Sequence, residues 1–105
     1  MFSLKHLFPI ISNVLDGVCA SGLNEAKLGN KYFGGLISTY SPAFKASEFS
    51  KIMKYSHHIT FNSISQINKY KKFCINKKID IGVRINPLYS EVEVSKYNSS
   101  NLSSR

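Results

Sequence analysis

The sequence predicts an α/β fold in which short parallel strands alternate with helices. Short apolar runs rich in branched residues recur along the chain, and segments with helical periodicity separate them. Successive strand starts lie about 20–22 residues apart, a spacing that predicts parallel strands joined by right-handed crossovers. The length of 105 residues allows one domain, and we assign residues 1–97 to a partial barrel and residues 98–105 to a polar tail.

The first part of the chain is expected to form a helix and then a strand. Residues 3–15 contain an apolar stretch that is interrupted by Pro9 and by two polar residues, which predicts an amphipathic helix. No stretch approaches the roughly 18 continuous apolar residues of a membrane span, so we expect a cytoplasmic protein without a membrane partner. Residues 16–20 form the first predicted strand.

The second helix and strand are bounded by small residues. Ser21 is expected to cap the helix, and Glu25 is favourably placed in its first turn. Gly29-Asn30 is expected to end the helix, because glycine commonly follows a helix C-terminus. Gly34-Gly35 then forms a loop before the second predicted strand, residues 36–40.

A third helix and strand follow. Ser41-Pro42 ends the preceding strand, because the residue before proline avoids the helical conformation. A helix is predicted over residues 47–55, and residues 57–62 alternate as a third strand does. Either Ser63 or Ser65 can cap the next helix.

The fourth unit completes the predicted sheet. Residues 79–85 form a β-branched strand that Asn86-Pro87 ends. Four strand-helix units equal half of an eight-fold barrel, but they also suit a small open sheet, and periodicity alone does not distinguish the two. The apolar positions of the preceding helix repeat with the helical period: Ile64, Ile67, Tyr70, Phe73 and Cys74.

The charge of the chain is strongly positive. Its 14 Lys and Arg residues outnumber 6 Asp and Glu, giving a net charge of +8, and such an excess is typical of nucleic-acid-binding proteins. However, only Arg84 and Arg105 are arginines, the residue type that phosphate and base recognition favours. The densest lysine run, residues 69–78, lies late in a predicted helix, where cations complement the helix dipole. We therefore expect a solvated, Lys-rich surface and no nucleic-acid partner.

The cysteines and histidines do not form a metal-binding pattern. Cys19 and Cys74 are far apart and belong to no Cys-x-x-Cys motif, so we expect two buried or half-buried free thiols in a reducing compartment. His57 and His58 are adjacent and would point to opposite faces of a strand. No metal site is predicted.

Six segments, taken in order, resemble one enzyme family. Their order and spacing over roughly residues 2–98 are similar to those of carboxynorspermidine decarboxylase, also called carboxyspermidine decarboxylase. That family is similar in fold to alanine racemase, ornithine decarboxylase and diaminopimelate decarboxylase. The segments are residues 18–29 (VCASGLNEAKLG), 31–35 (KYFGG), 40–45 (YSPAFK), 59–66 (ITFNSISQ), 82–87 (GVRINP) and 89–92 (YSEV).

The resemblance implies a partial (β/α)8 barrel and a carboxy-lyase of polyamine biosynthesis that depends on pyridoxal phosphate. Its substrates would be carboxynorspermidine or carboxyspermidine, and its products norspermidine or spermidine. The cofactor ring accepts the electrons left by the departing CO₂. Residues 1–97 would then belong to a cofactor-binding barrel, and the full-length family implies a homodimer.

The resemblance also implies where the cofactor contacts lie. Arg84 ends a predicted strand, where barrel enzymes place active-site groups, and family analogy puts an arginine there in the cofactor pocket. Ser21 is expected either to face the cofactor or to cap a helix, and Asn62-Ser63, at the end of the third strand, has the same ambiguity with weaker support. The family's cofactor-bearing lysine would precede Phe2-Ser3, and its phosphate loop would follow Arg105. We therefore expect no catalytic residue within these 105 residues and no activity from them alone.

Two functions of another class are kept as alternatives. The first alternative is a non-catalytic module that associates with complementary barrel pieces. The second is a small basic domain that binds nucleic acid. The first is motivated by the sheet edges and apolar faces that half a barrel would leave uncovered. The second rests on the positive charge alone.

Overall fold

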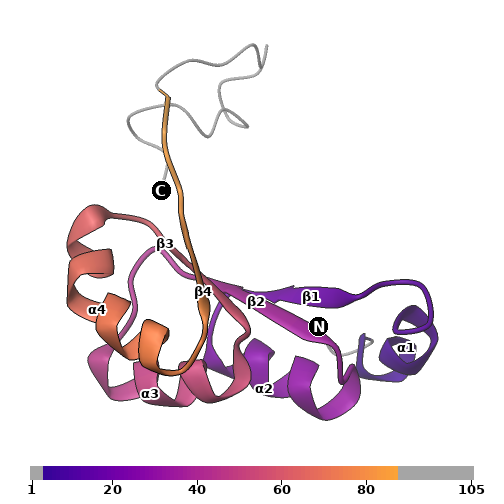
Figure 1. Ribbon diagram of the computed structural model, residues 1–105. Coiled ribbons are helices and arrows are strands. Elements are labelled where there is room, and N and C mark those ends of the chain that lie inside the picture. The colour runs from indigo at the N-terminus through magenta and orange to yellow at the C-terminus, as the bar shows by residue number, and fades with distance from the viewer. Residues whose placement is uncertain (1–3, 88–105) are drawn as a thin grey trace.

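The computed structural model describes residues 4–87, which form a sheet of four strands with the helices packed on one side of it (Figure 1). Helix and strand alternate from the first element to the last, as the sequence predicts. The predicted tail, residues 98–105, lies outside the described residues. The elements are α1 (Leu4–Ile11), β1 (Gly17–Ala20), α2 (Leu23–Tyr32), β2 (Leu36–Tyr40), α3 (Ala46–Tyr55), β3 (His58–Phe61), α4 (Ile64–Asn76) and β4 (Asp80–Val83).

The topology of the sheet resolves the choice between an open sheet and a barrel segment. All strands are parallel, and their order in space, β1-β2-β3-β4, is their order in the chain. In Figure 1, α2 and α3 lie below the sheet and α4 lies at its left end, and none of the three covers its upper face. A doubly wound sheet reverses its strand order and carries helices on both faces, whereas a (β/α)8 barrel keeps sequential order and outer helices. The prediction of a partial barrel is therefore confirmed.

The main core lies between β3, β4 and the helices that precede these strands, α3 and α4. Phe61 is fully buried there and packs edge-on against Phe44, with ring centroids 5.5 Å apart. Phe49 of α3 stacks on Tyr70 of α4 at 3.9 Å, which joins the two helices. Offset and edge-on arrangements of this kind are the ones that aromatic rings favour. The buried members of this core are Phe44, Phe49, Ile52, Ile59, Phe61, Tyr70, Cys74 and Ile79.

A smaller core lies under β1 and β2. It is built from Ala20, Ala26 and Ile37, with Val18 packed against it. These small side chains let α2 approach the sheet closely. The approach is closest at Gly29, where an added Cβ would lie 2.9 Å from a methyl group of Val18.

This close approach corrects the predicted end of α2. Gly29 is buried within the helix, which continues to Tyr32 instead of stopping at Gly29-Asn30. The glycine is therefore needed for packing. The chain leaves the helix at Gly34, whose φ of 75° lies in the left-handed region that glycine adopts without strain.

The start of α2 also differs from the prediction. Gly22, and not Ser21, occupies the N-cap position, and no side chain caps the helix there. Instead, the backbone N–H and the hydroxyl of Ser21 both donate to one carboxylate oxygen of Glu25, at 2.8 and 2.7 Å. Of the two serines that could cap α4, Ser63 does so, because its hydroxyl accepts a hydrogen bond from the backbone N–H of Gln66.

Several other predicted boundaries and burials are corrected. The first helix is shorter than residues 3–15, and α3 begins one residue earlier than predicted. The third and fourth strands are also shorter than residues 57–62 and 79–85. Ile64 and Phe73 are exposed, because α4 buries only the side that Tyr70 and Cys74 share. Within residues 4–87, no helix is long and apolar enough to cross a membrane.

Candidate functional site

The candidate site lies on the face of the sheet that the helices leave open. Because side chains alternate along a strand, every second residue of β1–β4 belongs to this face. The parallel register aligns Cys19, Ser38, His58 and Asp80 in one row across the strands. The next row toward the carboxyl ends contains Tyr40, Thr60 and Gly82.

The strands contribute no lysine to the open face. The strands read GVCA, LISTY, HITF and DIGV, so every lysine among residues 4–87 lies on a helix or in a loop. The positive surface is therefore carried by the helices and loops. The strand residues of the open face are mostly neutral, Leu36 and Tyr40 among them, with one carboxylate and one imidazole.

One hydrogen bond joins the middle strands on this face. The Oγ of Ser38 lies 2.7 Å from Nδ1 of His58, and both side chains are half-buried. The other ring nitrogen of His58 faces β4, where a Cβ added to Gly82 would lie only 2.9 Å from it. A side chain at position 82 would thus displace the imidazole ring or the strand. This clash explains the glycine in β4.

Arg84 lies where β4 ends, at the carboxyl edge of the sheet. Its backbone N–H donates to the carbonyl of Phe61 at 2.9 Å and so extends the pairing with β3 by one residue. Its Nη1 donates to the hydroxyl of Tyr40 at 2.9 Å, and its guanidinium carbon lies 5.9 Å from the centroid of that ring. The hydroxyl of Tyr40 in turn donates to Oδ1 of Asn62 at 3.2 Å. A half-buried cation is thus held at the edge where barrel enzymes bind their ligands.

Ser21 and Arg84 follow the two edge strands of the sheet, β1 and β4. Three strand spacings of about 4.8 Å, or about 14 Å, separate β1 from β4. The hydroxyl of Ser21 is engaged by Glu25, and this serine lines a pocket of about 340 Å³ together with Glu25 and Glu48. The sheet therefore brings Arg84 together with Tyr40 and Asn62, but it does not bring Ser21 into that cluster.

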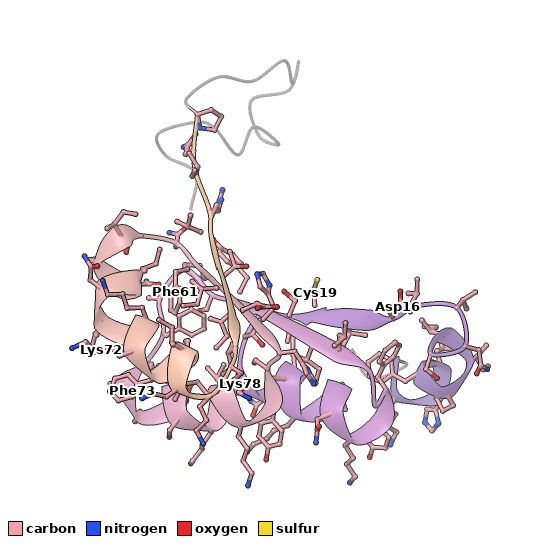
Figure 2. All side chains as sticks on the ribbon, viewed as in Figure 1. Asp16, Cys19, Phe61, Lys72, Phe73 and Lys78 are labelled. Atoms are coloured by element: carbon pink, nitrogen blue, oxygen red, sulfur yellow. The ribbon has the colours of Figure 1, made fainter. Side chains whose placement is uncertain are left out.

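The two cysteines lie in contrasting places. Cys19 is exposed on the open face, which corrects the prediction that both thiols are buried or half-buried; no helix covers that face. Figure 2 shows its sulfur pointing away from the helices, whereas Phe61 lies on the helix side. Cys74 is fully buried in the main core, and this burial raises the pKa of its thiol.

The adjacent histidines have separate partners on β2. Nδ1 of His57 accepts a hydrogen bond from the backbone N–H of Ile37 at 3.1 Å, while His58 bonds to Ser38. In the part of the chain that the structure describes, no three His, Cys, Asp or Glu side chains gather as metal ligands.

Sequence reasoning missed Tyr40 and His58 as members of the site. Both residues alternate with buried residues of the same strand, and this alternation indicates that they lie on the open face of the sheet. The buried residues are Ile37 and Thr39 in β2 and Ile59 in β3. Counting the parallel register from strand to strand would have placed Tyr40 near Arg84.

Comparisons with known proteins agree on one enzyme group. The chain is 37% identical over 97 residues to carboxyaminopropylagmatine decarboxylase of Synechocystis sp., and 38% identical over 97 residues to carboxynorspermidine/carboxyspermidine decarboxylase of Campylobacter jejuni. Each match covers 92% of this chain and 25% of the relative. The corresponding enzyme of Herminiimonas arsenicoxydans is 36% identical over 86 residues, or 82% of the chain and 23% of that enzyme. No family model matches the chain.

A solved structure extends the likeness to the fold. The crystal structure of carboxynorspermidine decarboxylase from Campylobacter jejuni, complexed with norspermidine, superimposes with a TM-score of 0.75 at 37% identity. The match covers 88% of this chain and 24% of that one. The chain thus spans about a quarter of the length of the relatives it matches. Over that quarter, in sequence and in fold, it is a homologue of the carboxynorspermidine/carboxyspermidine decarboxylases.

Proposed function

We propose that this chain forms part of a pyridoxal-phosphate-dependent decarboxylase that removes the carboxylate from carboxynorspermidine or carboxyspermidine. The observation that carries the proposal is the 38% identity over 97 residues to the Campylobacter enzyme of that name. The position of Arg84 at the carboxyl edge of a barrel-type sheet supports it. Because the Synechocystis relative is named for carboxyaminopropylagmatine, that compound is a third substrate to test.

The residues at this edge fit the cofactor's chemistry. Pyridoxal phosphate is an anion, and Arg84 supplies a fixed cation beside the neutral polar groups of Tyr40 and Asn62. When bound, the cofactor supplies a sink for the electrons that the departing carboxylate leaves behind. We infer that Arg84 contacts an anionic group of the cofactor.

Ser21 is the weaker of the two proposed cofactor contacts. The Glu25 carboxylate already accepts a hydrogen bond from the Ser21 hydroxyl, and Glu48 lines the same pocket. Two carboxylates at this pocket would repel the cofactor phosphate. A cofactor contact at Ser21 is therefore expected to be through an uncharged part of the molecule, and it stays a prediction.

We also infer that the 105 residues do not catalyse the reaction alone. The described strands offer no lysine amine on the open face, and covalent attachment of this cofactor requires one. The family resemblance implies, as an expectation, that the cofactor-bearing lysine precedes Phe2-Ser3. The substrate, the dependence on the cofactor and a cytoplasmic location are all parts of this proposal.

The test is a chimera with the Campylobacter enzyme. The stretch of that enzyme that matches this chain would be replaced by the corresponding 97 residues, and release of CO₂ from the three carboxylated polyamines would be measured with added cofactor. We expect the chimera to decarboxylate at least one of them. Arg84→Ala in the chimera should lower kcat/KM on the order of 100-fold, the usual loss when one preorganised charge contact is removed.

Controls separate loss of function from loss of folding. Lys72→Ala changes a cation on the outer helix α4 and should leave kcat/KM unchanged. A chimera that folds, as judged by circular dichroism, yet decarboxylates none of the three compounds would contradict the proposed function.

For the isolated chain, we expect no CO₂ release and no cofactor adduct after borohydride treatment. A stoichiometric adduct accompanied by turnover would overturn its proposed inactivity.

A second candidate function is association with other barrel strands. Strands β1 and β4 are edges of the described sheet, and neither contains the lysine or proline that commonly protects an edge. Leu36, on the open face, is 56% exposed, and Val83 at the β4 edge is 41% exposed. Surface of this kind is usually covered in a stable protein.

Sedimentation velocity over a range of concentrations tests this association. We expect the isolated chain to associate reversibly, and Leu36→Lys to weaken the association by placing a charge on the open face. Ile75→Lys, at a 65% exposed position of α4, is the matched control and should have no effect. A chain that stays monomeric at all concentrations would exclude this candidate. The homodimer expected of the full-length family is a separate prediction.

A further inference from the structure

Three strand ends meet in one directed chain of hydrogen bonds. The hydroxyl of Tyr40, in β2, accepts from Nη1 of Arg84 at 2.9 Å and donates to Oδ1 of Asn62 at 3.2 Å. A phenol hydroxyl has a single proton. Because Tyr40 donates this proton to Asn62, the hydroxyl oxygen uses a lone pair to accept the hydrogen bond from the guanidinium. The hydrogen bonds therefore run from Arg84 through Tyr40 to Asn62.

The neighbours of Tyr40 explain how its ring reaches across the sheet. In its row, β3 contributes Thr60 and β4 contributes Gly82, so only a short side chain and a hydrogen lie beside the ring. Arg84 and Asn62 each follow the end of a strand, one level above that row. Tyr40 thus spans from β2 to the end of β4 and contacts the guanidinium by both its hydroxyl and, at 5.9 Å, its ring.

We propose that Tyr40, anchored by Asn62, is a positioning residue that fixes the Arg84 guanidinium for an anionic group at the carboxyl edge of the sheet. A free arginine side chain loses considerable rotamer entropy when it is ordered, and a preformed hydrogen bond removes part of that cost before the anion binds. The identity of the anion, pyridoxal phosphate, rests on the proposed function. The positioning itself rests only on the contacts among the three side chains.

Nuclear magnetic resonance can observe the positioning directly. The chain contains two arginines, Arg84 and Arg105, so its Nε–Hε spectrum holds two side-chain signals, and Arg84→Lys identifies one of them. In the unmodified chain we expect the Arg84 signal to exchange slowly with water and to show restricted motion. Tyr40→Phe keeps the ring but removes the hydroxyl, and should speed this exchange at least about threefold, the effect of one net hydrogen bond.

Two further variants complete the design. Asn62→Ala should produce a smaller change of the same sign, because Tyr40 then loses its acceptor but keeps its bond to Arg84. Tyr32→Phe is the matched control, a half-buried tyrosine on α2 that should leave the Arg84 signal unchanged. Backbone amide spectra verify that each variant stays folded. An Arg84 signal that is identical in the unmodified chain and in folded Tyr40→Phe would overturn the proposal.

A titration with pyridoxal phosphate adds the anion and uses pyridoxal, which lacks the phosphate, for comparison. We expect pyridoxal phosphate to move the Arg84 signal and Tyr40→Phe to weaken its binding about three- to tenfold. If Arg84 is ordered by Tyr40 but pyridoxal phosphate does not move its signal, the inferred contact between Arg84 and the cofactor fails and the positioning stands. If pyridoxal phosphate binds with equal affinity to the unmodified chain and to Tyr40→Phe, the positioning proposal fails.

Discussion

The two faces of the sheet are built from alternate residues of the same strands, yet they differ in almost every physical property. The face toward the helices buries Ile37, Ile59 and Phe61 completely, or nearly so. The face away from the helices carries Ser38, His58 and other half-buried polar groups. Even the polar Thr39 on the covered face is satisfied, because its hydroxyl lies 2.6 Å from that of Ser56.

The difference shows how stability and chemistry are separated in this fold. Burial of apolar side chains on the covered face supplies most of the favourable free energy of folding. The open face contributes little of it, so its residues are available to hold a cation and polar partners at the carboxyl edge. Substitutions at adjacent positions of one strand should therefore have very different effects on unfolding.

The largest expected effect is the loss of Phe61. Phe61→Ala should lower the free energy of unfolding by about 3–5 kcal/mol, because it removes a fully buried ring that packs against Phe44 and Phe49. Thr60→Ala, one residue earlier on the open face, should cost less than about 1 kcal/mol. Urea unfolding followed by circular dichroism measures both, and Phe61→Leu serves if the alanine variant does not fold. Equal costs at positions 60 and 61 would contradict the division between faces.

The two thiols should differ in reactivity by about 100-fold or more. Cys19 is exposed on the open face, whereas Cys74 is fully buried and its thiol pKa is raised by desolvation, which disfavours the reactive thiolate. Ellman's reagent at pH 8 should therefore label Cys74→Ser rapidly, through Cys19, and Cys19→Ser slowly. Similar rates in the two folded variants would mean that the covered face opens readily.

The raised pKa of Cys74 also predicts the direction of a pH effect on stability. The folded state holds the Cys74 proton more tightly than the unfolded chain does. The contribution of the Cys74 thiol to the free energy of unfolding is therefore fully present below the ordinary thiol pKa. This contribution is lost as the pH rises above that value. Unfolding midpoints in urea between pH 7.5 and 10 should show a smaller alkaline decline in Cys74→Ser than in Cys19→Ser.

An intermediate effect is expected where α2 touches the covered face. Gly29→Val should cost about 2 kcal/mol, because even the first carbon of a side chain would lie 2.9 Å from Val18 and the helix would have to move outward. Asn30→Val is the matched control on the next, exposed position of the same helix, and it should change stability little, since Asn and Val have similar helix propensities. Equal urea midpoints for the two variants would show that α2 adapts freely.

Gly29 also shows where sequence reasoning reached its limit for the fold. The alternation of helix and strand was predictable, because it follows from periods of 3.6 and 2 residues that local sequence displays. Gly29 was misread as a helix end because its role depends on the distance to Val18, a residue of another element. Ser21 was misassigned as the cap for a related reason: Glu25 competes for its hydroxyl across the first turn.

For the candidate site, sequence reasoning named Arg84 and Asn62 but missed Tyr40, the residue that joins them. Arg84 could be named because barrel enzymes place their active-site groups at strand ends and because the family resemblance pointed to it. Tyr40 acts through a contact 44 residues away in the chain, and only the register of three strands brings the two together. Ser21 and Arg84 follow the two edge strands of the described sheet, and their contact with one cofactor stays a prediction.

The smallest expected effect lies outside both faces, in the turn that joins α4 to β4. Lys78 has a φ of 56°, in the left-handed region, and its N–H donates to the carbonyl of Ile75 at 3.0 Å to close the helix. A residue with a Cβ is strained in this conformation, so Lys78→Gly relieves strain in the folded state. Glycine also has greater freedom in the unfolded chain, which offsets part of this gain. Lys78→Gly should therefore stabilise the fold by less than about 1 kcal/mol. Lys77→Gly is the matched control: Lys77 has an ordinary φ of −91°, so the same substitution should destabilise by about 0.5–1 kcal/mol. Both variants lose one positive charge from the same helix end, so the opposite signs in urea unfolding isolate the backbone. Two changes of the same sign would instead indicate that charge at this helix end, and not the conformation of Lys78, governs the stability of the turn.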